Sequence, residues 1–455
     1  MPGVRPVTTI MLLAFLPVIA LANGAQLDDR DRNIHIPGDD DLFDQLRVSA
    51  AYDDSHIQIH YEYVTDNPSW YHQYWVYEDG DWVRYGSGSP GPDEHGLYED
   101  RISMMLDDGT VDDFARIGGW MTVHQGMRTL TSEADSDEVE DHPKLGEDMG
   151  RSDVRKYLAL SRDTDDEREA AWQDVRDDDE LEQLRRDGKF LDLWQWRAHR
   201  SNPMGYADNG YVLHYRMSSE GRSMFTDNWD EDAGQPRYMF DPDQVGSRSL
   251  DWDALIDREY GQDDPYYIYE GNAVNFDPDH DWQEGDVIPQ RFLRPPHGSR
   301  GAIQAAGRYT DGAWRVTLIR TLEAPDPMDS KTLEDGGTYN VAFAVHSGGV
   351  GARWHRVSLP QTLGLGHDDA DIVAVRADGD FSDVELEWTE LTLIYPGQVT
   401  WQWLHGDHPG SEPLATGNLG VRDFHDIEQL QTFIIGHETR LAEEEDDDEQ
   451  DSDDD

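Results

Sequence analysis

The sequence predicts an all-β chain, a β-sandwich with helical and irregular insertions, and three observations support this prediction. Many short segments alternate between apolar and polar residues, which is the period of a half-buried strand. Turn signals separate these segments, among them Asp311-Gly312, a typical hairpin turn. Long helical patterns are few. Short, regularly punctuated strands of this kind are typical of sandwiches.

Two hairpins are expected near the N-terminus. Residues 46–64 alternate on both sides of a turn, and residues 71–85 do so around Asp79-Gly80-Asp81. Residues 99–105 and 111–117 are expected to be short helical or irregular pieces.

The middle of the chain alternates between charged and strand-like stretches. Residues 163–188 are dense in charge and carry a sparse apolar stripe at helical spacing, which predicts one or two exposed helices. Strand-like material returns at 190–196 and 211–217. Residues 227–264 are rich in Asp, Gly and Pro and are expected to form a polar connection.

The C-terminal third contains the strongest strand signals. Residues 314–319 follow the hairpin turn, and residues 339–346 form a nearly continuous apolar run suited to a strand covered on both faces. Residues 384–400 alternate again. Residues 442–455 form an acidic tail that is disordered by composition.

The formal net charge of −59 is extreme, and lysine occurs at four positions only. Repulsion among so many carboxylates destabilises a compact state in dilute buffer and is relieved by salt. The charge therefore predicts a high-salt environment; an acidic metal-binding surface is the alternative. A nucleic-acid partner is excluded, because a phosphate backbone requires a basic surface.

The sequence contains no cysteine, which excludes disulfides, thiolate metal sites and thiol nucleophiles. It also contains no G-x-S-x-G, H-E-x-x-H or P-loop motif, so the common hydrolase patterns are absent.

The first 25 residues are typical of an export signal. Arg5 precedes an apolar run at 10–21, and Ala20-Leu21-Ala22 is a small-residue cleavage pattern. A membrane anchor is the alternative, but the run is shorter than the ~20 residues of a spanning helix. We therefore expect a periplasmic or extracellular protein with no membrane span after signal removal, built as one domain over residues 26–441.

Residues 272–366 contain two distinctive sequence segments, GDVIPQRFLRPPHGSRGAIQAAGRYTDGAWRVTLIRTL and GGTYNVAFAVHSGGVGARWHRVSLPQTLGLG. This block resembles the haem-binding domain of the ethylbenzene dehydrogenase type. That family includes γ subunits of some molybdenum oxidoreductases and related periplasmic cytochromes. The resemblance extends from about residue 50 to about residue 425, and it implies a β-sandwich that binds haem and transfers electrons rather than a catalyst.

The resemblance implies two candidate haem ligands near residue 124. Periplasmic relatives carry a haem-attachment sequence here, with cysteines where this chain has Gly119 and Val123. His124 remains, and Met127 lies three residues on with a thioether suited to haem iron. The plainer alternatives are a hydrogen-bonded structural histidine and a packing methionine.

A second candidate, His425, ends the segment Val421-Arg422-Asp423-Phe424-His425, where some relatives carry C-x-x-C-H. A structural role is the alternative. Because no cysteine is present, any haem would be non-covalent haem b.

A third hallmark is Trp194-Gln195-Trp196-Arg197, which corresponds to a W-x-W-K motif whose lysine is a haem ligand in the γ subunits. A guanidinium has no lone pair for iron, so Arg197 is expected to pair with a propionate instead. His199 lies on the same face of a strand and is a candidate second axial ligand. For His199 a structural role is again the alternative.

Tryptophan, arginine and histidine side chains elsewhere in the sequence are further candidates for the same site or its surroundings. Trp194 and Trp196 are expected to wall a flat cofactor pocket, although sandwich cores also contain tryptophans. Arg294, near Pro295-Pro296, is a candidate propionate partner. His346 and His355 are expected to be structural.

The function predicted is an exported electron-transfer protein with haem b, working with a periplasmic redox partner. Two alternatives remain. One is a cofactor-free sandwich that binds carbohydrate through exposed tryptophans such as Trp194 or Trp401. The other is a subunit of a molybdenum oxidoreductase complex.

Overall fold

The computed structural model describes residues 26–27, 34–35, 43–86, 91–130, 132–350, 355–394, 396, 399–406 and 420–421. The predicted signal peptide, the acidic tail and His425 lie outside the described residues. Within the described part of the chain, no helix is long and apolar enough to cross a membrane.

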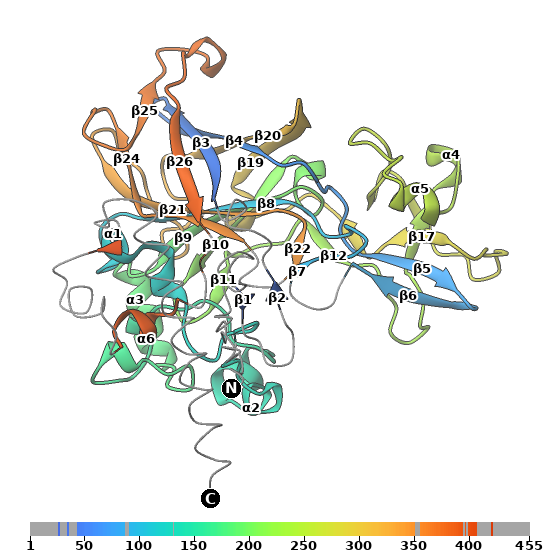
Figure 1. Cartoon of the computed structure of the whole chain (residues 1–455), viewed down its shortest axis with the longest axis horizontal. Helices are drawn as coiled ribbons and strands as arrows, with labels where there is room; N and C mark the ends of the chain where they lie inside the picture. Colours follow the sequence, from blue (N-terminus) through green and yellow to red (C-terminus); the bar gives the residue numbers. More distant parts are fainter. Residues whose placement is uncertain are drawn as a thin grey trace, which may run out of the picture.

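The largest element is a sheet of 13 strands among the described residues (Figure 1). Its strands are β3 (Phe43–Tyr52), β4 (His56–Val64), β8 (Arg101–Asp107), β9 (Leu191–Arg197), β10 (Tyr206–Val212), β11 (Arg216–Ser218), β19 (Ile303–Thr310), β20 (Ala313–Thr321), β21 (Thr338–His346), β23 (Arg356–Ser358), β24 (Gln361–Leu365), β25 (Ile372–Arg376) and β26 (Thr389–Ile394). The path β3-β4-β20-β19-β10-β9-β8-β21-β24-β25 returns to β3. The prediction of an all-β chain is confirmed. The two layers expected of a sandwich are opposite walls of a single sheet that closes on itself like a barrel.

A side lobe extends from the barrel beside β12, on the right of Figure 1. Its four-stranded sheet has the order β14 (Leu250–Asp251), β17 (Asp286–Pro289), β5 (Tyr74–Glu78), β6 (Asp81–Tyr85). The neighbouring short elements are β12 (Phe225–Asp227), β13 (Tyr238–Phe240), α4 (Pro242–Val245), α5 (Trp252–Ile256), β15 (Ile268–Tyr269), β16 (Ala273–Asn275) and β18 (Arg291–Leu293). Residues 227–264, predicted to be a polar connection, therefore carry several of these elements. The remaining short strands are β1 (Gln26–Leu27), β2 (Ile34–His35), β7 (Gly91–Pro92) and β22 (Gly349–Val350).

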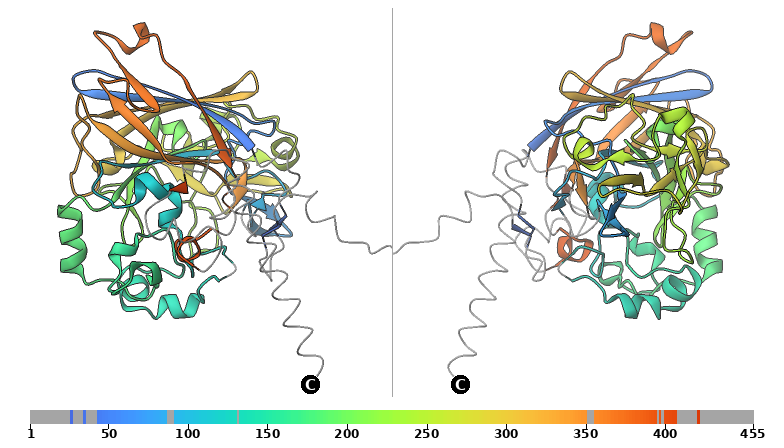
Figure 2. Two further views of the ribbon diagram at one scale, coloured as in Figure 1. Left: turned by 60° about the vertical axis from the view of Figure 1, so that its left-hand side comes forward. Right: turned by 90° about the vertical axis from the view of Figure 1, so that its right-hand side faces the viewer.

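A helical layer lies beneath the barrel, drawn mainly in teal in Figure 2. It consists of α1 (Phe114–Ile117), η2 (Gly118–Thr122), α2 (Ser136–Glu140), η3 (Pro143–Asp148), η4 (Ala159–Ser161), η5 (Glu167–Glu169), α3 (Asp178–Arg186) and α6 (Trp401–Leu404). The short elements η6 (Asn202–Met204), η7 (Ser299–Gly301) and η8 (Phe381–Asp383) lie elsewhere in the chain. α3 confirms a helix in the charged stretch, and its start is capped by the Asp177 carboxylate, which accepts from the Glu180 amide at 3.0 Å.

The predicted hairpins are confirmed. β3 pairs with β4, β5 with β6, and β19 with β20, all antiparallel. Asp79-Gly80 and Asp311-Gly312 have positive φ at both positions, 52° and 93° in the first and 53° and 82° in the second. Consecutive residues with positive φ are typical of type I′ turns, whose twist matches that of the paired strands.

The strands β8 and β9 are buried along their whole length. Met104 and Trp194 point into the barrel core, whereas Met105 and Leu193 belong to a second core shared with Phe114 and other residues of the helical layer. A strand covered on both faces does not alternate between apolar and polar residues. The prediction that residues 99–105 are helical or irregular was wrong for this reason, while α1 bears out a short helical piece within 111–117.

Asp100, directly before β8, joins three parts of the molecule. Its fully buried carboxylate accepts from the Ser69 amide (2.9 Å), the Trp314 indole (2.7 Å) and the Gly348 amide (2.6 Å). Burial raises the pKa of Asp100 to about 7, although these hydrogen bonds act in the opposite direction. The carboxylate thus holds its proton in the folded state over a range where an unfolded chain has already lost it.

We predict a measurable pH dependence of stability from this group. An Asp in the unfolded chain ionises near pH 4, and the native Asp100 ionises near pH 7. The free energy of unfolding therefore falls as pH rises from 4 to 7, and this group causes no further change above pH 7. Three pKa units correspond to ~4 kcal/mol. Urea titrations in molar salt should show the free energy of unfolding of the wild-type protein falling by about this amount, relative to Asp100→Asn, across that range. Parallel pH profiles of the two proteins would contradict the prediction.

Candidate functional site

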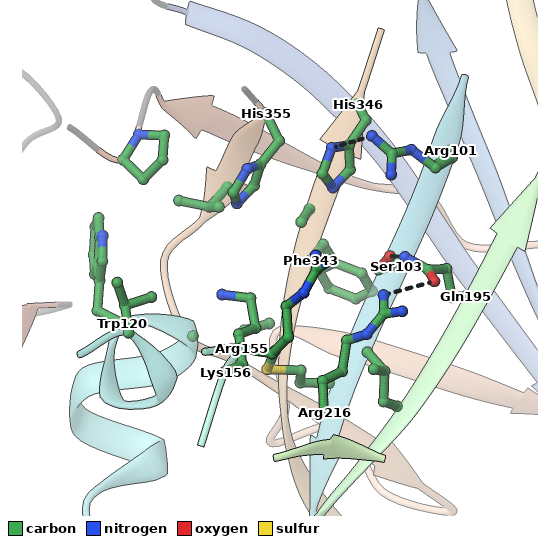
Figure 3. A pocket seen from close by; sticks show the side chains of 18 of the residues that line it. Arg101, Ser103, Trp120, Arg155, Lys156, Gln195, Arg216, Phe343, His346 and His355 are labelled. Carbon is green, nitrogen blue, oxygen red and sulfur yellow. Dashed lines mark hydrogen bonds between the residues drawn. The ribbon is translucent and has the colours of Figure 1, made fainter. Parts of the chain in front are cut away.

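A cavity lies between the helical layer and the face of β8, β9 and β21 that points away from the barrel core (Figure 3). Its volume is about 190 Å³. Typical ligand pockets measure roughly 300–1,000 Å³. The cavity is smaller than this range, so a large organic ligand would extend beyond it toward solvent.

The sheet wall of the cavity follows from the pleat of the strands. Ser103 and Met105 of β8 and Leu193 and Gln195 of β9 line it, since alternate residues share one face of a strand. On β21 the same alternation brings forward the following residues: Ala342, Ala344 and His346.

The other wall comes from η2 and the segment that follows it. Trp120, Val123 and Met127 supply an apolar surface. Gly119 adds open space, because a methyl group built on it meets no atom within 4 Å. Small residues on both walls thus leave a gap between apolar surfaces.

The lining is strongly cationic. It includes Arg101, Arg128, Arg155, Lys156 and Arg216, and no Asp or Glu is among the described lining residues. The whole chain has 96 acidic and 37 basic side chains, so this concentration of cations runs against the composition. Such a lining suits an apolar ligand that also carries anionic groups.

Two histidines lie at one end of the cavity. The rings of His346 and His355 stack at 4.6 Å with an interplanar angle of 19°. Arg101 donates from Nη2 to His346 Nδ1 at 2.9 Å and to the Gly349 carbonyl at 3.0 Å. A guanidinium only donates, so His346 carries its proton on Nε2 in this arrangement and acts there as a donor. Sequence reasoning did not place either histidine in the site; the alternation of His346 with Ala342 and Ala344 was the signal for it.

Two thioethers reach the cavity, one from each wall. Met105 comes from β8, and Met127 comes from the segment after η2. The Met127 sulfur accepts a hydrogen bond from the His124 amide at 3.3 Å, which fixes the position of the side chain. The structure thus places Met127, predicted from its distance to His124, on the wall of the cavity, and adds Met105, which was not predicted.

His124 is fully buried and does not line the cavity. Its ring stacks on Tyr157 at 3.9 Å, with Nε2 3.2 Å from the Met121 carbonyl oxygen and 3.0 Å from that of Tyr157. Nδ1 lies 3.2 Å from the Gln402 amide nitrogen. Burial lowers the pKa of His124 well below its ordinary value. Both ring nitrogens are therefore used within the protein, as expected of a structural histidine.

His199 lies outside the cavity lining, close to the side lobe. Its Nδ1 is 3.1 Å from the Trp70 carbonyl oxygen, and its ring packs against Tyr74 and Tyr266 at 6.0 and 5.7 Å. Burial lowers the pKa of His199 to about 4. The structure does not bring His199 together with Met127.

Arg197 lies on the same face of β9 as Leu193 and Gln195, but it is not among the residues that line the cavity. Its guanidinium donates to Asp208 at 2.7 Å and also to the Gln195 side-chain oxygen. Arg300 donates to the same carboxylate at 2.9 Å. Burial alone would raise the pKa of Asp208, but the two guanidinium groups hold it at about 2. Arg197 therefore already has a carboxylate partner.

The predicted tryptophan wall is not formed by Trp194 and Trp196. Both side chains are fully buried in the barrel core, on the face opposite to the cavity. Trp401 is buried as well and donates to the Glu167 carbonyl at 2.6 Å. Neither Trp194 nor Trp401 offers an exposed platform for a sugar. Arg294 donates to the Ser223 carbonyl at 3.1 Å and lies outside the cavity lining.

Within the described ranges, no three or more His, Cys, Asp or Glu side chains are grouped so that they could hold a metal ion. The donors around the cavity are instead single thioethers and imidazoles beside an apolar gap.

Known proteins resemble this chain in sequence. The family model described as ethylbenzene dehydrogenase matches residues 17–358, which include all the strands named above as cavity walls. A 120-residue segment is 28% identical to "Cytochrome c-552" of Stutzerimonas stutzeri and makes up 24% of this chain. That segment spans 39% of the cytochrome, well under two thirds of its length. Because the family model covers most of the chain, the protein belongs to the ethylbenzene dehydrogenase family.

Proposed function

We propose that this protein is an exported electron-transfer protein that holds haem b without covalent attachment in the cavity between the sheet and the helical layer. The cavity itself carries the proposal, since it combines apolar walls, thioether donors and a cationic lining. Family membership and the similarity to a cytochrome support it. The absence of cysteine from the sequence excludes thioether attachment, so retention would depend on non-covalent contacts alone.

The residues present fit a flat apolar ring that carries an iron and two carboxylates. Gly119, Ala342 and Ala344 leave the gap, while Trp120 and Leu193 supply apolar contact. Arg101, Lys156 and Arg216 of the lining are suited to carboxylates, whereas Arg128 and Arg155 pair with Asp153 at 3.4 and 2.8 Å. No acidic side chain of the described lining would repel them.

We assign the iron-binding role to Met105 and Met127, one thioether from each wall. Arg197 cannot replace the lysine ligand of the γ subunits, because a guanidinium has no lone pair and this one is paired with Asp208. Bound haem would supply one-electron chemistry at its iron. The protein contributes the donors, an apolar environment and the cations that fix orientation.

The electron donor or acceptor is proposed to be a respiratory partner outside the cytoplasm, or the other subunits of a molybdenum oxidoreductase. The export signal expected over residues 1–25 supports this location, and the charge of −59 supports a high-salt environment.

Replacement of either thioether should change the haem spectrum. We predict that Met105→Leu and Met127→Leu each abolish the thioether-ligated spectrum and weaken haem binding at least about tenfold. The loss would come from the missing thioether and not from unfolding, because a volume-conserving swap costs the fold less than ~1.5 kcal/mol. Met104→Leu is the matched control, since Met104 points into the barrel core. Absorption and magnetic circular dichroism spectra of haem-loaded proteins measure the outcome. Unchanged spectra in both Met105 and Met127 variants would exclude this ligand pair.

Filling the cavity should block haem. We predict that Gly119→Phe weakens haem binding by more than about tenfold without unfolding the protein, because the side chain would enter open space and the φ of Gly119 is not positive. Gly379→Phe is the control, as Gly379 is exposed and also has open space around it. Haem titration followed by absorbance, with a urea titration of each variant, tests this. Equal haem affinity in the two variants would place the haem site elsewhere.

A further inference from the structure

Arg216 is one of the cations that line the cavity. It lies at the start of β11, opposite Val212 of β10, and its exposed side chain lines the cavity. Among the residues that the structure describes, no carboxylate forms an ion pair with it. Its hydrogen bond goes to the side-chain oxygen of Gln195, which Nη1 meets at 3.3 Å. A guanidinium bound to a neutral amide retains donors and a full charge for an anionic group of a ligand.

Gln195 is fixed from two other directions. Its amide nitrogen donates to Ser103 Oγ at 3.0 Å, and its oxygen also accepts from Arg197. The oxygen therefore faces two guanidinium groups, that of Arg197 on the same face of β9 and that of Arg216 from the cavity. Figure 3 shows Gln195 beside Ser103 and the guanidinium of Arg216, to which dashed lines join it. Because Gln195 is nearly fully buried, it offers Arg216 a rigid acceptor.

Gln195 is held by a buried ion-pair network through its contact with Arg197. Asp208 accepts from Arg197 at 2.7 Å and from Arg300 at 2.9 Å, so one carboxylate serves two guanidinium groups. No negative charge of this network is left over for Arg216. The network thus holds Gln195 in place, and its carboxylate pairs directly with Arg197 and Arg300 rather than with Arg216.

We infer that Arg216 is the carboxylate anchor of the cavity, that Gln195 is its positioning residue, and that the group they select is a haem propionate; this rests on the proposed haem function. Arg197, which stands where the γ subunits have a lysine ligand, donates to Gln195 and so helps to position Arg216. Arg216 would then recognise the porphyrin ring through its carboxylates. Esterification of the carboxylates would remove this charge-assisted pair and weaken binding.

The test compares ferric protoporphyrin IX with its dimethyl ester, both added from one organic stock and followed by absorbance. The wild-type protein should bind the diacid more tightly than the ester. Arg216→Gln should weaken diacid binding by about 10- to 100-fold and ester binding by less than about threefold. Gln195→Glu should give the same pattern, since its added charge would pair with Arg216.

Arg308→Gln is the control for loss of a positive charge, because Arg308 is exposed on β19 and pairs with Asp263 outside the cavity. It should leave both affinities unchanged. Equal affinity of the wild-type protein for diacid and ester, or an equal loss of both in Arg216→Gln, would overturn the inference while leaving haem binding intact. Failure of the wild-type protein to bind either compound would overturn the proposed function as well.

Discussion

The site depends on the burial of β8, β9 and β21 on both faces. One face of these strands closes the barrel core with Met104, Trp194 and Trp196, and the other forms the wall of the cavity. The period of two along a strand divides neighbouring residues between these environments, so Met104 and Met105 have different roles although they are adjacent. A slip of one residue would exchange core and cavity side chains.

Much of the fold could be predicted from local signals. The Asp-Gly turns specify two hairpins, and the continuous apolar run at residues 339–346 corresponds to β21, which is covered on both faces. β8 was missed because RISMMLD has neither alternation nor a turn signal, and its strand character comes from pairing with β9 and β21. The position of the helical layer over these strands is a long-range property that no local pattern encodes.

The site was less predictable than the fold. Met127 was found through its spacing from His124, but the ring nitrogens of His124 serve backbone carbonyls and Gln402. The tryptophans of the W-x-W motif face the barrel core, and the cavity receives Leu193 and Gln195 between and beside them. Knowing that 191–197 is a strand does not say which face meets the cavity. The cationic lining could not be predicted either, because Arg101, Arg155 and Arg216 come from separate parts of the chain.

The proposed function requires haem held in this cavity by non-covalent contacts. Its most direct test is an absorption spectrum of the wild-type protein, exported by a host that makes haem, purified in molar salt and recorded before and after dithionite. We predict a Soret band and, on reduction, sharp α and β bands, with the haem extractable by acidified solvent because no cysteine anchors it. A featureless spectrum that persists after haem is added in excess would contradict the account.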